Sequence, residues 1–476
     1  MLYLYRKKQI NIIPLLMSKD SLSAADCQTS PTLFELEPVE GKKVIVDFTA
    51  PDLSSLGGLA LVREYEKASC HILDRIESCI RDPRNPLFTV HSQSEMIRQR
   101  VYQIMAGFED ADDCDRLRGD GILKMCAGRT AHDEIDLASQ PTMTRLENRL
   151  SRMELFDIGE AFVDDFMASY DSEPDSIIID ADDTDADTYG AQQLTLFNAY
   201  YGEYCYMPLL LFEGRSGKLI LPILRPGRGN KSINVSGLLR RLILKVRRRW
   251  KHTAIIVRGD SHFCSHDFMD WATDRQDNIH FITGLAGNAK LQRITARWLD
   301  SAIASYKANG GEDVRVFHSF MYKAGTWKHQ QRVVVKIEVS KLGTNVRYVV
   351  TDFKGQRSSF IYSDCYCDRG RMELMISELK HGLKADRMSC NKFSANQFRL
   401  YLHCAAYVLM HSLRTDMLTG TELESCTIAT MRDKLILNAV SIDEKKTCIR
   451  LRFSKKASMM PEIVQVLTRL RHLPPS

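Results

Sequence analysis

The sequence lacks the features by which membrane, secreted and nucleotide-hydrolysing proteins are recognised. Its apolar N-terminal stretch, MLYLYRKKQINIIPLLM, is too short and too interrupted by charge to span a membrane. The chain has 13 cysteines, which is an odd number, and shows no signal-peptide pattern. Both observations indicate a reducing compartment and predict no disulfide framework. No second cysteine pair follows Cys365 and Cys367 at the spacing found in zinc fingers, so a structural zinc site is not expected. There is also no Walker loop and no internal repeat.

The charge balance is nearly even. The chain has 65 Lys and Arg against 60 Asp and Glu, which gives a net charge of +5. This is only mildly basic, so the distribution of the charges says more than their total. With 476 residues, of which 44% are hydrophobic, the chain can bury a large core divided among two or three domains.

Two predicted strands end in aspartates. The run Ile177–Ile179 in SIIIDADDTD predicts a buried strand that leads to Asp182, and Ile255–Val257 in AIIVRGDSHF leads to Asp260 in the same way. A carboxylate at a strand end costs little when it binds a cation, and Mg²⁺ prefers oxygen ligands. The two strand ends are therefore candidates for a shared metal site.

The first of these motifs contains three neighbouring acids. With a period of two residues, Asp180 and Asp182 lie on one face of the strand, whereas Asp183 points to the other. Asp182 also forms the pattern D-x-T with Thr184. Periodicity alone leaves the three aspartates as rivals for the same role.

The stretch YCDRGRMELMISELK places one acid between two cations on a single helix face. At 100° per residue, Tyr366, Arg369, Glu373 and Lys380 share a narrow stripe, whereas Glu378 projects from another side. Beside this stripe runs an apolar one that predicts burial, formed by Met372, Met375, Ile376, Leu379 and Leu383. Glu373 is therefore predicted at the edge of a core, beside two cations.

The segments between these motifs predict the order strand, strand, strand, helix, strand. YCYMPLLLFEG and KLILPILR favour strands, and SGLLRRLILKVRRRW favours a crossover helix. This order matches a ribonuclease H-like α/β core. The stretch from Asp260 to Glu373 is too long for a plain crossover, and VRVFHSF, QQRVVVKIEVS and VRYVVTDF within it predict a mainly β insertion.

With these motifs in this order, the chain resembles the DDE transposases of bacterial insertion sequences, in the branch with a Tyr-Arg-Glu-Lys signature. The resemblance covers most of the chain and includes upstream stretches such as RDPRNP and LASQPTMTRLENRL. Two departures stand out: His262 occupies a position where the family usually has glycine, and Asp183 adds an acid. On this resemblance we choose Asp182 as the first catalytic acid, with Asp180 as a plausible neighbour.

The resemblance implies a concrete activity. Asp182, Asp260 and Glu373 would be the catalytic and metal-binding residues for two Mg²⁺ ions, for which Mn²⁺ can substitute. The enzyme would cleave insertion-sequence ends and join their 3′-hydroxyl groups to target DNA, and whether a hairpin intermediate forms stays open. The implied partners are terminal inverted repeats, target DNA and a second copy in a synaptic homodimer, with no membrane or small-molecule substrate. The implied location is the bacterial cytoplasm, on nucleoid DNA.

Further residues are predicted to contact DNA. By resemblance, Arg369 and Lys380 would bind phosphates, Tyr366 would hydrogen-bond or stack near the transposon end, and Trp327 in KAGTWKHQQ would receive a displaced base. Trp327 could equally be a packing residue. Two other readings stay open for the chain: a metal-dependent nuclease without strand transfer, and a domesticated DNA-binding protein.

The predicted helix over 236–250 carries a cationic ridge opposite an apolar face. The cationic ridge consists of Arg240, Lys245, Arg247, Arg248 and Lys251. Periodicity does not tell whether this ridge contacts DNA phosphates or is simply solvated.

The sequence predicts six regions. They are an N-terminal arm (1–40), a helical DNA-end-binding region (41–165), a first core part (175–290), a mainly β insertion (291–360), a second core part with the signature helix (361–415) and a basic C-terminal region (416–476). Residues 163–174 are predicted to connect the helical region to the core. A helix is predicted to start near Ser92 and another to cover 142–150.

Overall fold

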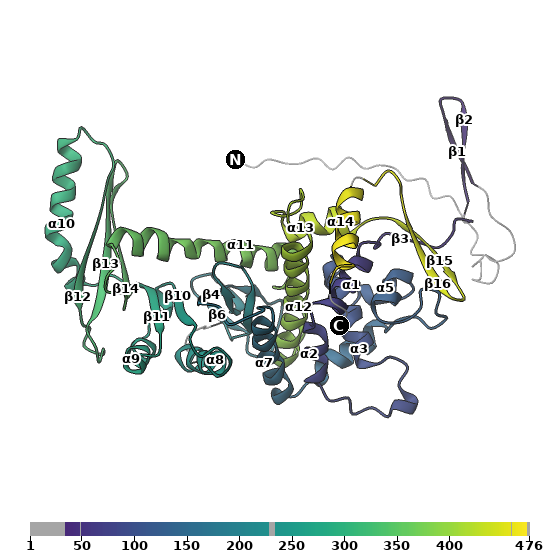
Figure 1. Ribbon diagram of the computed structural model, residues 1–476, viewed down its shortest axis with the longest axis horizontal. Coiled ribbons are helices and arrows are strands. Elements are labelled where there is room, and N and C mark those ends of the chain that lie inside the picture. Colours follow the sequence, from purple (N-terminus) through teal and green to yellow (C-terminus); the bar gives the residue numbers. More distant parts are fainter. Residues whose placement is uncertain (1–33, 48, 228–233, 458, 474–476) are drawn as a thin grey trace, which may run out of the picture. The chain divides into compact units, whose positions relative to one another are not determined.

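The computed structural model describes residues 34–47, 49–227, 234–457 and 459–473 (Figure 1). The chain forms two compact units, 1–53 and 54–476. In the first unit, β1 (Phe34–Val39) and β2 (Lys42–Val46) form an antiparallel hairpin whose turn has positive φ at Glu40 and Gly41. Most of the predicted N-terminal arm lies outside the described residues. None of the described helices combines the length and apolarity needed to cross a bilayer.

The second unit is built around an eight-stranded sheet with the order β12-β13-β14-β11-β10-β4-β8-β9. Its core strands are β4 (Ser176–Asp183), β8 (Leu209–Glu213), β9 (Leu219–Ile223), β10 (Ala254–Gly259) and β11 (Ile279–Leu285). β8 and β9 run antiparallel beside β4, whereas β10 and β11 run parallel to it. Helix α8 (Val235–Arg249) makes the crossover to β10, and α9 (His266–Arg275) connects β10 to β11. The predicted ribonuclease H-like order is confirmed.

Burial explains why these segments form central strands and a covering helix. Ile177, Ile179 and Ala181 on one face of β4 are fully buried, and so is Asp180 on the other face, as expected for a strand with packed layers on both sides. In α8 the apolar face at Leu239, Leu242, Ile243 and Val246 is buried, and the Asn234 side chain caps the helix start. One face of the sheet packs against α8, α9 and α10, and the other packs in part against the signature segment (Figure 1).

The insertion extends the core sheet. Its elements are α10 (Ala289–Ala308), β12 (Val314–Tyr322), β13 (Gln331–Ser340) and β14 (Gly343–Thr351). β14 pairs antiparallel with β11, so the three inserted strands continue the sheet of the core. The three strands were predicted, whereas the 20-residue helix α10 was not.

Helices surround the other end of the sheet. They are α1 (Leu59–Ala68), α2 (Ile72–Ser78), η2 (Pro86–Phe88), α3 (Gln93–Met105), α4 (Asp113–Leu117), α5 (Gly121–Cys126), α6 (Gln140–Arg149), α7 (Arg152–Ala168) and α12 (Phe393–Met417). Ser92 caps α3 as predicted. The predicted connection over 163–174 is wrong in its first half, because α7 continues to Ala168 and buries Val163 and Phe166.

Three smaller parts complete the unit. Strands β5 (Ala186–Asp187), β6 (Leu196–Asn198) and β7 (Glu203–Tyr206) form a small sheet next to the end of β4. The C-terminal region contains α13 (Ile428–Met431), η8 (Arg432–Ile436), β15 (Val440–Lys445), β16 (Cys448–Phe453) and α14 (Met460–Leu470). A short strand, β3 (Leu53–Ser54), lies at the boundary between the two units.

The signature residues lie on one uninterrupted helical segment of mixed type. It consists of η5 (Phe360–Tyr366), η6 (Cys367–Gly370), α11 (Arg371–Ser377) and η7 (Glu378–Gly382), in which η5 and η7 are π-helical and η6 is a 3₁₀ turn. We call 360–382 the signature segment. π turns are rare and concentrate at functional sites. Met372, Leu379 and Leu383 of the predicted apolar stripe are buried.

Candidate active site

Two strand-end aspartates lie side by side at one edge of the central sheet. The parallel pairing of β4 with β10 sets Gly259 opposite Ala181, so Asp260 and Asp182 follow at neighbouring positions. Asp182 accepts a hydrogen bond from the Asp183 amide (3.0 Å), and Asp260 accepts one from the His262 amide (2.8 Å). Burial raises the pKa of Asp182; Arg369 opposes this shift, and the negative charge of Asp260 reinforces it.

Asp180 belongs to a different network. It lies opposite Arg258 of β10 and is fully buried. Arg258 Nε and Nη2 donate to the two Asp180 carboxylate oxygens at 2.6 and 2.7 Å. Arg258 Nη1 also donates to the Cys365 carbonyl (2.6 Å) and lies 3.3 Å from the Asp368 carboxylate. Asp180 thus ties β4 and β10 to the signature segment, and its oxygens are already occupied.

Asp183 points away from both neighbours, as period two predicts. Its carboxylate forms an ion pair with Arg225, which is itself fully buried. Burial raises the pKa of Asp183 to about 6, and Arg225 opposes this shift. Of the three aspartates, Asp182 is the one that forms an ion pair with a residue of the signature segment, Arg369. Asp182 is half-buried at the edge of the sheet.

The signature cations contact carboxylates at the end of β4. Arg369 Nη1 donates to Asp182 Oδ2 (2.8 Å), and Lys380 Nζ donates to Asp185 Oδ1 (3.0 Å). Tyr366 lies against β11, where a Cβ on Gly284 would come within 2.8 Å of the Tyr366 hydroxyl and of the Ser261 amide. Glycine at 284 therefore leaves room for the Tyr366 ring beside the Asp260 turn.

Glu373 lies between Arg369 and Lys380 on the signature segment, with an exposed side chain. Among the described residues, none makes a hydrogen bond or an ion pair with its carboxylate. The predicted stripe assumed 100° per residue, whereas π and 3₁₀ turns advance by different angles. Among the described residues, Glu373, Asp182 and Asp260 do not form a group whose carboxylate oxygens all lie within 4.8 Å of one another.

A different set of carboxylates is gathered nearby. Asp185, Asp187 of β5 and Glu203 of β7 have carboxylate oxygens that all lie within 4.8 Å of one another. Cross-strand pairing of β5 with β7 creates this cluster, which the sequence analysis missed. The alternating acids of DTDAD were the available signal, but their partner Glu203 is identified only once the two short strands are paired.

Trp327 lies in the core of the insertion. Its side chain is 7% exposed and packs edge-to-face on Tyr322, with ring centroids 5.4 Å apart. This burial agrees with the alternative in which Trp327 is a packing residue.

The cationic ridge of α8 is partly used within the protein. Lys245 Nζ lies 2.9 Å from both the Glu160 and the Asp164 carboxylates of α7, and Arg240 donates to the Asp267 carbonyl. Arg248 is exposed. A surface hollow of about 310 Å³ is lined by Glu160, Gly237, Arg240, Arg241, Leu244, Lys245 and Arg248. Only part of the predicted ridge is therefore available to an external anion.

The donor set at the sheet edge fits a hard divalent cation. Asp182 and Asp260 supply carboxylate oxygens from adjacent strands, and Asp185, Asp187 and Glu203 supply further ones close by. Oxygen-only ligands of this kind suit Mg²⁺ and Mn²⁺ rather than softer metals. A cation would also offset the repulsion between Asp182 and Asp260, which acts to raise the pKa of Asp182.

One family model covers most of the chain. The family model described as transposase DDE domain group 1 matches residues 36–475. No curated protein matches the chain. A solved structure of the piggyBac transposase synaptic complex with hairpin DNA aligns with 80% of this chain and 79% of that chain, at 11% identity and a TM-score of 0.46.

Proposed function

Because the chain belongs to the transposase DDE domain group 1 family and is a DDE transposase, we propose that Asp182, Asp260 and Glu373 catalyse its reaction. The reaction is cleavage of the DNA at the ends of the element, followed by transfer of the 3′-hydroxyl ends to target DNA. The observation that carries the assignment is the register of β4 and β10, which sets Asp182 beside Asp260 at the edge of the sheet.

DDE transposases use divalent metals, and the metal proposed for this chain is Mg²⁺, for which Mn²⁺ can substitute. Asp182 and Asp260 would hold it, and Glu373 would complete the ligand set from the signature segment. When bound, metal ions in such sites stabilise the attacking and leaving oxygens of a displacement at phosphorus. The absence of protein partners for Glu373 among the described residues supports its availability as a ligand.

The signature cations would position the DNA strand. Arg369 presents a planar guanidinium that can donate two parallel hydrogen bonds to a phosphate, and Lys380 supplies a compact point charge. Both already contact carboxylates, at Asp182 and Asp185, which supports an anion-binding role at these positions. The Tyr366 hydroxyl, beside the Asp260 turn, would hydrogen-bond to the same strand.

The proposed DNA partners are the terminal inverted repeats of the element and the target DNA. Two copies of the chain would hold the two ends in a synaptic homodimer. Of the cationic ridge, Arg248 and Lys251 have exposed side chains, and Arg248 also lines the surface hollow, so Arg248 is chosen for phosphate contact.

The test is a cleavage and joining assay with a labelled element end, Mg²⁺ and then target DNA. Asp182→Ala, Asp260→Ala and Glu373→Ala should each abolish both products. Asp364→Ala is the matched control, because Asp364 is an exposed acid on the same helical segment. Cleavage by the wild type without any joined product would favour a plain metal-dependent nuclease. Unimpaired joining by Asp182→Ala, with loss in a folded Asp180 variant, would refute the choice of Asp182.

A further inference from the structure

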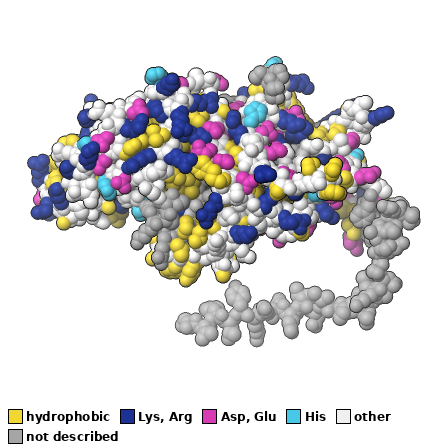
Figure 2. All heavy atoms as spheres, turned by 90° about the horizontal axis from the view of Figure 1, so that it is seen from below, with side chains coloured by type: hydrophobic (Ala, Val, Ile, Leu, Met, Phe, Trp, Pro, Cys, Tyr) yellow, Lys and Arg dark blue, Asp and Glu magenta, His cyan; other side chains and the backbone are white. Residues whose placement is uncertain are grey.

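Exposed aromatic rings gather on the hairpin that β6 and β7 form. We call residues 196–206 the aromatic hairpin. Its rings at Phe197, Tyr200, Tyr201 and Tyr204 are all exposed, with Tyr200 at 87% and Tyr204 at 60%. They pair edge-to-face, Tyr200 with Tyr201 at 4.9 Å and Phe197 with Tyr204 at 5.5 Å between ring centroids. Figure 2 shows hydrophobic side chains gathered on this projecting part of the molecule. Exposed apolar patches of this kind mark binding surfaces.

The base of the aromatic hairpin is fixed to the chain that follows the signature segment. The Gln193 amide donates to the Asn391 carbonyl (2.9 Å), and Gln192 Nε2 donates to the Cys390 carbonyl (2.7 Å). The Tyr206 hydroxyl donates to the Gln193 carbonyl (2.6 Å), and the Tyr206 ring is buried. The base of the aromatic hairpin is therefore fixed before any ligand binds, which lowers the entropic cost of binding.

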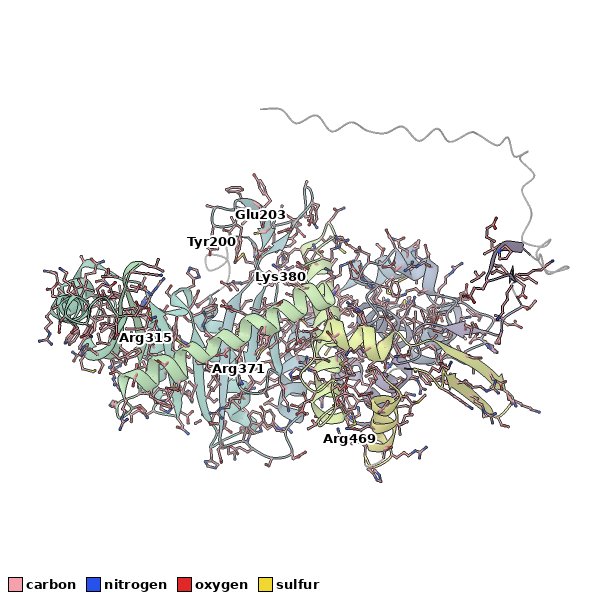
Figure 3. All side chains as sticks on the ribbon, turned by 90° about the horizontal axis from the view of Figure 1, so that it is seen from above. Tyr200, Glu203, Arg315, Arg371, Lys380 and Arg469 are labelled. Carbon is pink, nitrogen blue, oxygen red and sulfur yellow. The ribbon has the colours of Figure 1, made fainter. Side chains whose placement is uncertain are left out.

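The aromatic hairpin lies directly beside the candidate active site. Residues 182–185 lead from the end of β4 into β5, and β5 pairs with β7. Glu203 at the start of β7 shares the carboxylate cluster with Asp185, to which Lys380 is bound. Figure 3 shows Tyr200 and Glu203 on the same projecting element, next to Lys380. Tyr201 is the least exposed of these rings, and its partial burial raises its pKa to about 12, with the nearby charge of Asp185 adding to the shift.

The chemistry of the surface selects one occupant. Aromatic rings offer flat faces on which any unpaired base can stack. The carboxylate cluster beside them repels phosphates but tolerates neutral bases, so a strand would turn its bases toward the hairpin and its backbone toward Lys380. This inference rests on the proposed function, because it requires a DNA strand at Asp182 and Asp260.

We propose that the aromatic hairpin binds unpaired bases of the DNA strand that enters the active site, with Tyr200 and Tyr204 as the stacking surfaces. A fully paired end presents no free base faces, so the hairpin would favour ends that are already opened. It would thereby keep the strand at the catalytic acids after cleavage.

The test compares the affinity of the full chain for two element ends by fluorescence anisotropy. One end is fully paired and the other has three unpaired terminal bases. Wild type should prefer the unpaired end, and Tyr200→Ala or Tyr204→Ala should weaken binding to that end by roughly 5- to 150-fold. Tyr200→Phe should retain the preference, because stacking needs only the ring. Leu342→Ala is the matched control, since Leu342 is 92% exposed at another hairpin turn. A 5-iodouracil at an unpaired position should crosslink to the aromatic hairpin.

The outcomes separate this proposal from the function on which it rests. If wild type cleaves and joins DNA while the tyrosine variants bind both ends as wild type does, the proposal alone is overturned. If the variants instead convert a dimer to a monomer without changing the preference for unpaired ends, the surface binds a second copy and the proposal is likewise wrong. If wild type neither cleaves nor joins, the proposed function itself has failed.

Discussion

Strand β4 carries two aspartates that each pair with an arginine, and the two pairs differ in burial. Asp180 and Arg258 are both buried and are joined by two short hydrogen bonds. Two residues later, Asp182 and Arg369 are half-buried and share one hydrogen bond of 2.8 Å. Arg258 belongs to the adjacent strand, whereas Arg369 belongs to the signature segment.

These two pairs combine a fixed charge and an exchangeable charge at one edge of the sheet. A buried pair cannot lose one partner without leaving an uncompensated charge in the core, so Asp180 and Arg258 stay together. A half-buried pair loses little when water, a cation or a phosphate replaces one partner. Asp182 and Arg369 can therefore separate, and each would then be free for a metal or for DNA.

Breaking the pair of Asp180 and Arg258 should have the strongest consequence for stability. Asp180→Ala should lower the free energy of unfolding by about 3–5 kcal/mol, because it strands the Arg258 guanidinium in the core. Asp182→Ala should lower it by less than about 1 kcal/mol, since Arg369 keeps access to solvent. Urea unfolding followed by circular dichroism measures both. Equal destabilisation by the two variants would contradict the distinction between them.

The next effect concerns competition between Arg369 and a metal for Asp182. Arg369→Ala removes the cation that neutralises Asp182. Mg²⁺ or Mn²⁺ should therefore bind the DNA-free protein roughly tenfold more tightly, which corresponds to about 1.4 kcal/mol of binding free energy. Isothermal titration with Mn²⁺ measures this without any catalytic readout. Arg371→Ala is the matched control, because Arg371 is exposed on the same segment and its ion pair is to Asp368. An unchanged or weaker affinity would show that Arg369 does not compete.

The same contrast between fixed and free charges separates two residues of α8. Arg248→Ala should lower the slope of log affinity against log salt by about 0.9, as expected for one lost phosphate contact. Lys245→Ala should leave the slope unchanged, because Lys245 is already held by Glu160 and Asp164. DNA binding measured across a salt series tests both. A slope that falls only in Lys245→Ala would reverse the assignment.

Local patterns predicted most of the fold, including the two strands that lead to Asp182 and Asp260. The β-branched runs before Asp182 and Asp260 are short-range signals, and their pairing follows from the crossover helix α8. The bond from Arg258 to Asp180 could not be predicted, because it depends on the register of two strands almost eighty residues apart. Without that register, Asp180 and Asp182 look equivalent in the sequence.

Three features that the sequence pattern did not reveal share one physical cause, which is that tertiary partners decide the surroundings of each side chain. Lys245 belongs to a cationic face by periodicity, yet α7 supplies the acids that hold it. Trp327 lies beside a predicted turn, where an exposed side chain is common, yet it is buried against Tyr322 in the core of the insertion. The signature segment mixes π, 3₁₀ and α turns, which the side-chain pattern did not reveal, so a period of 100° per residue does not fix the direction of Glu373.

The smallest expected effect tests whether the insertion is as firmly joined to the core as Asp180 and Arg258 are to each other. His280 of β11 and Asp352 beyond β14 are 2.7 Å apart, and this hydrogen bond raises the pKa of His280. The bond stabilises the folded state fully below the unfolded pKa near 6.5, and its contribution is lost as pH rises through the higher folded value. Hydrogen exchange of the β11 and β14 amides should therefore quicken from pH 6 to pH 8 beyond the intrinsic rate. His280→Asn should remove this pH dependence, whereas its persistence in the variant would assign it to another group.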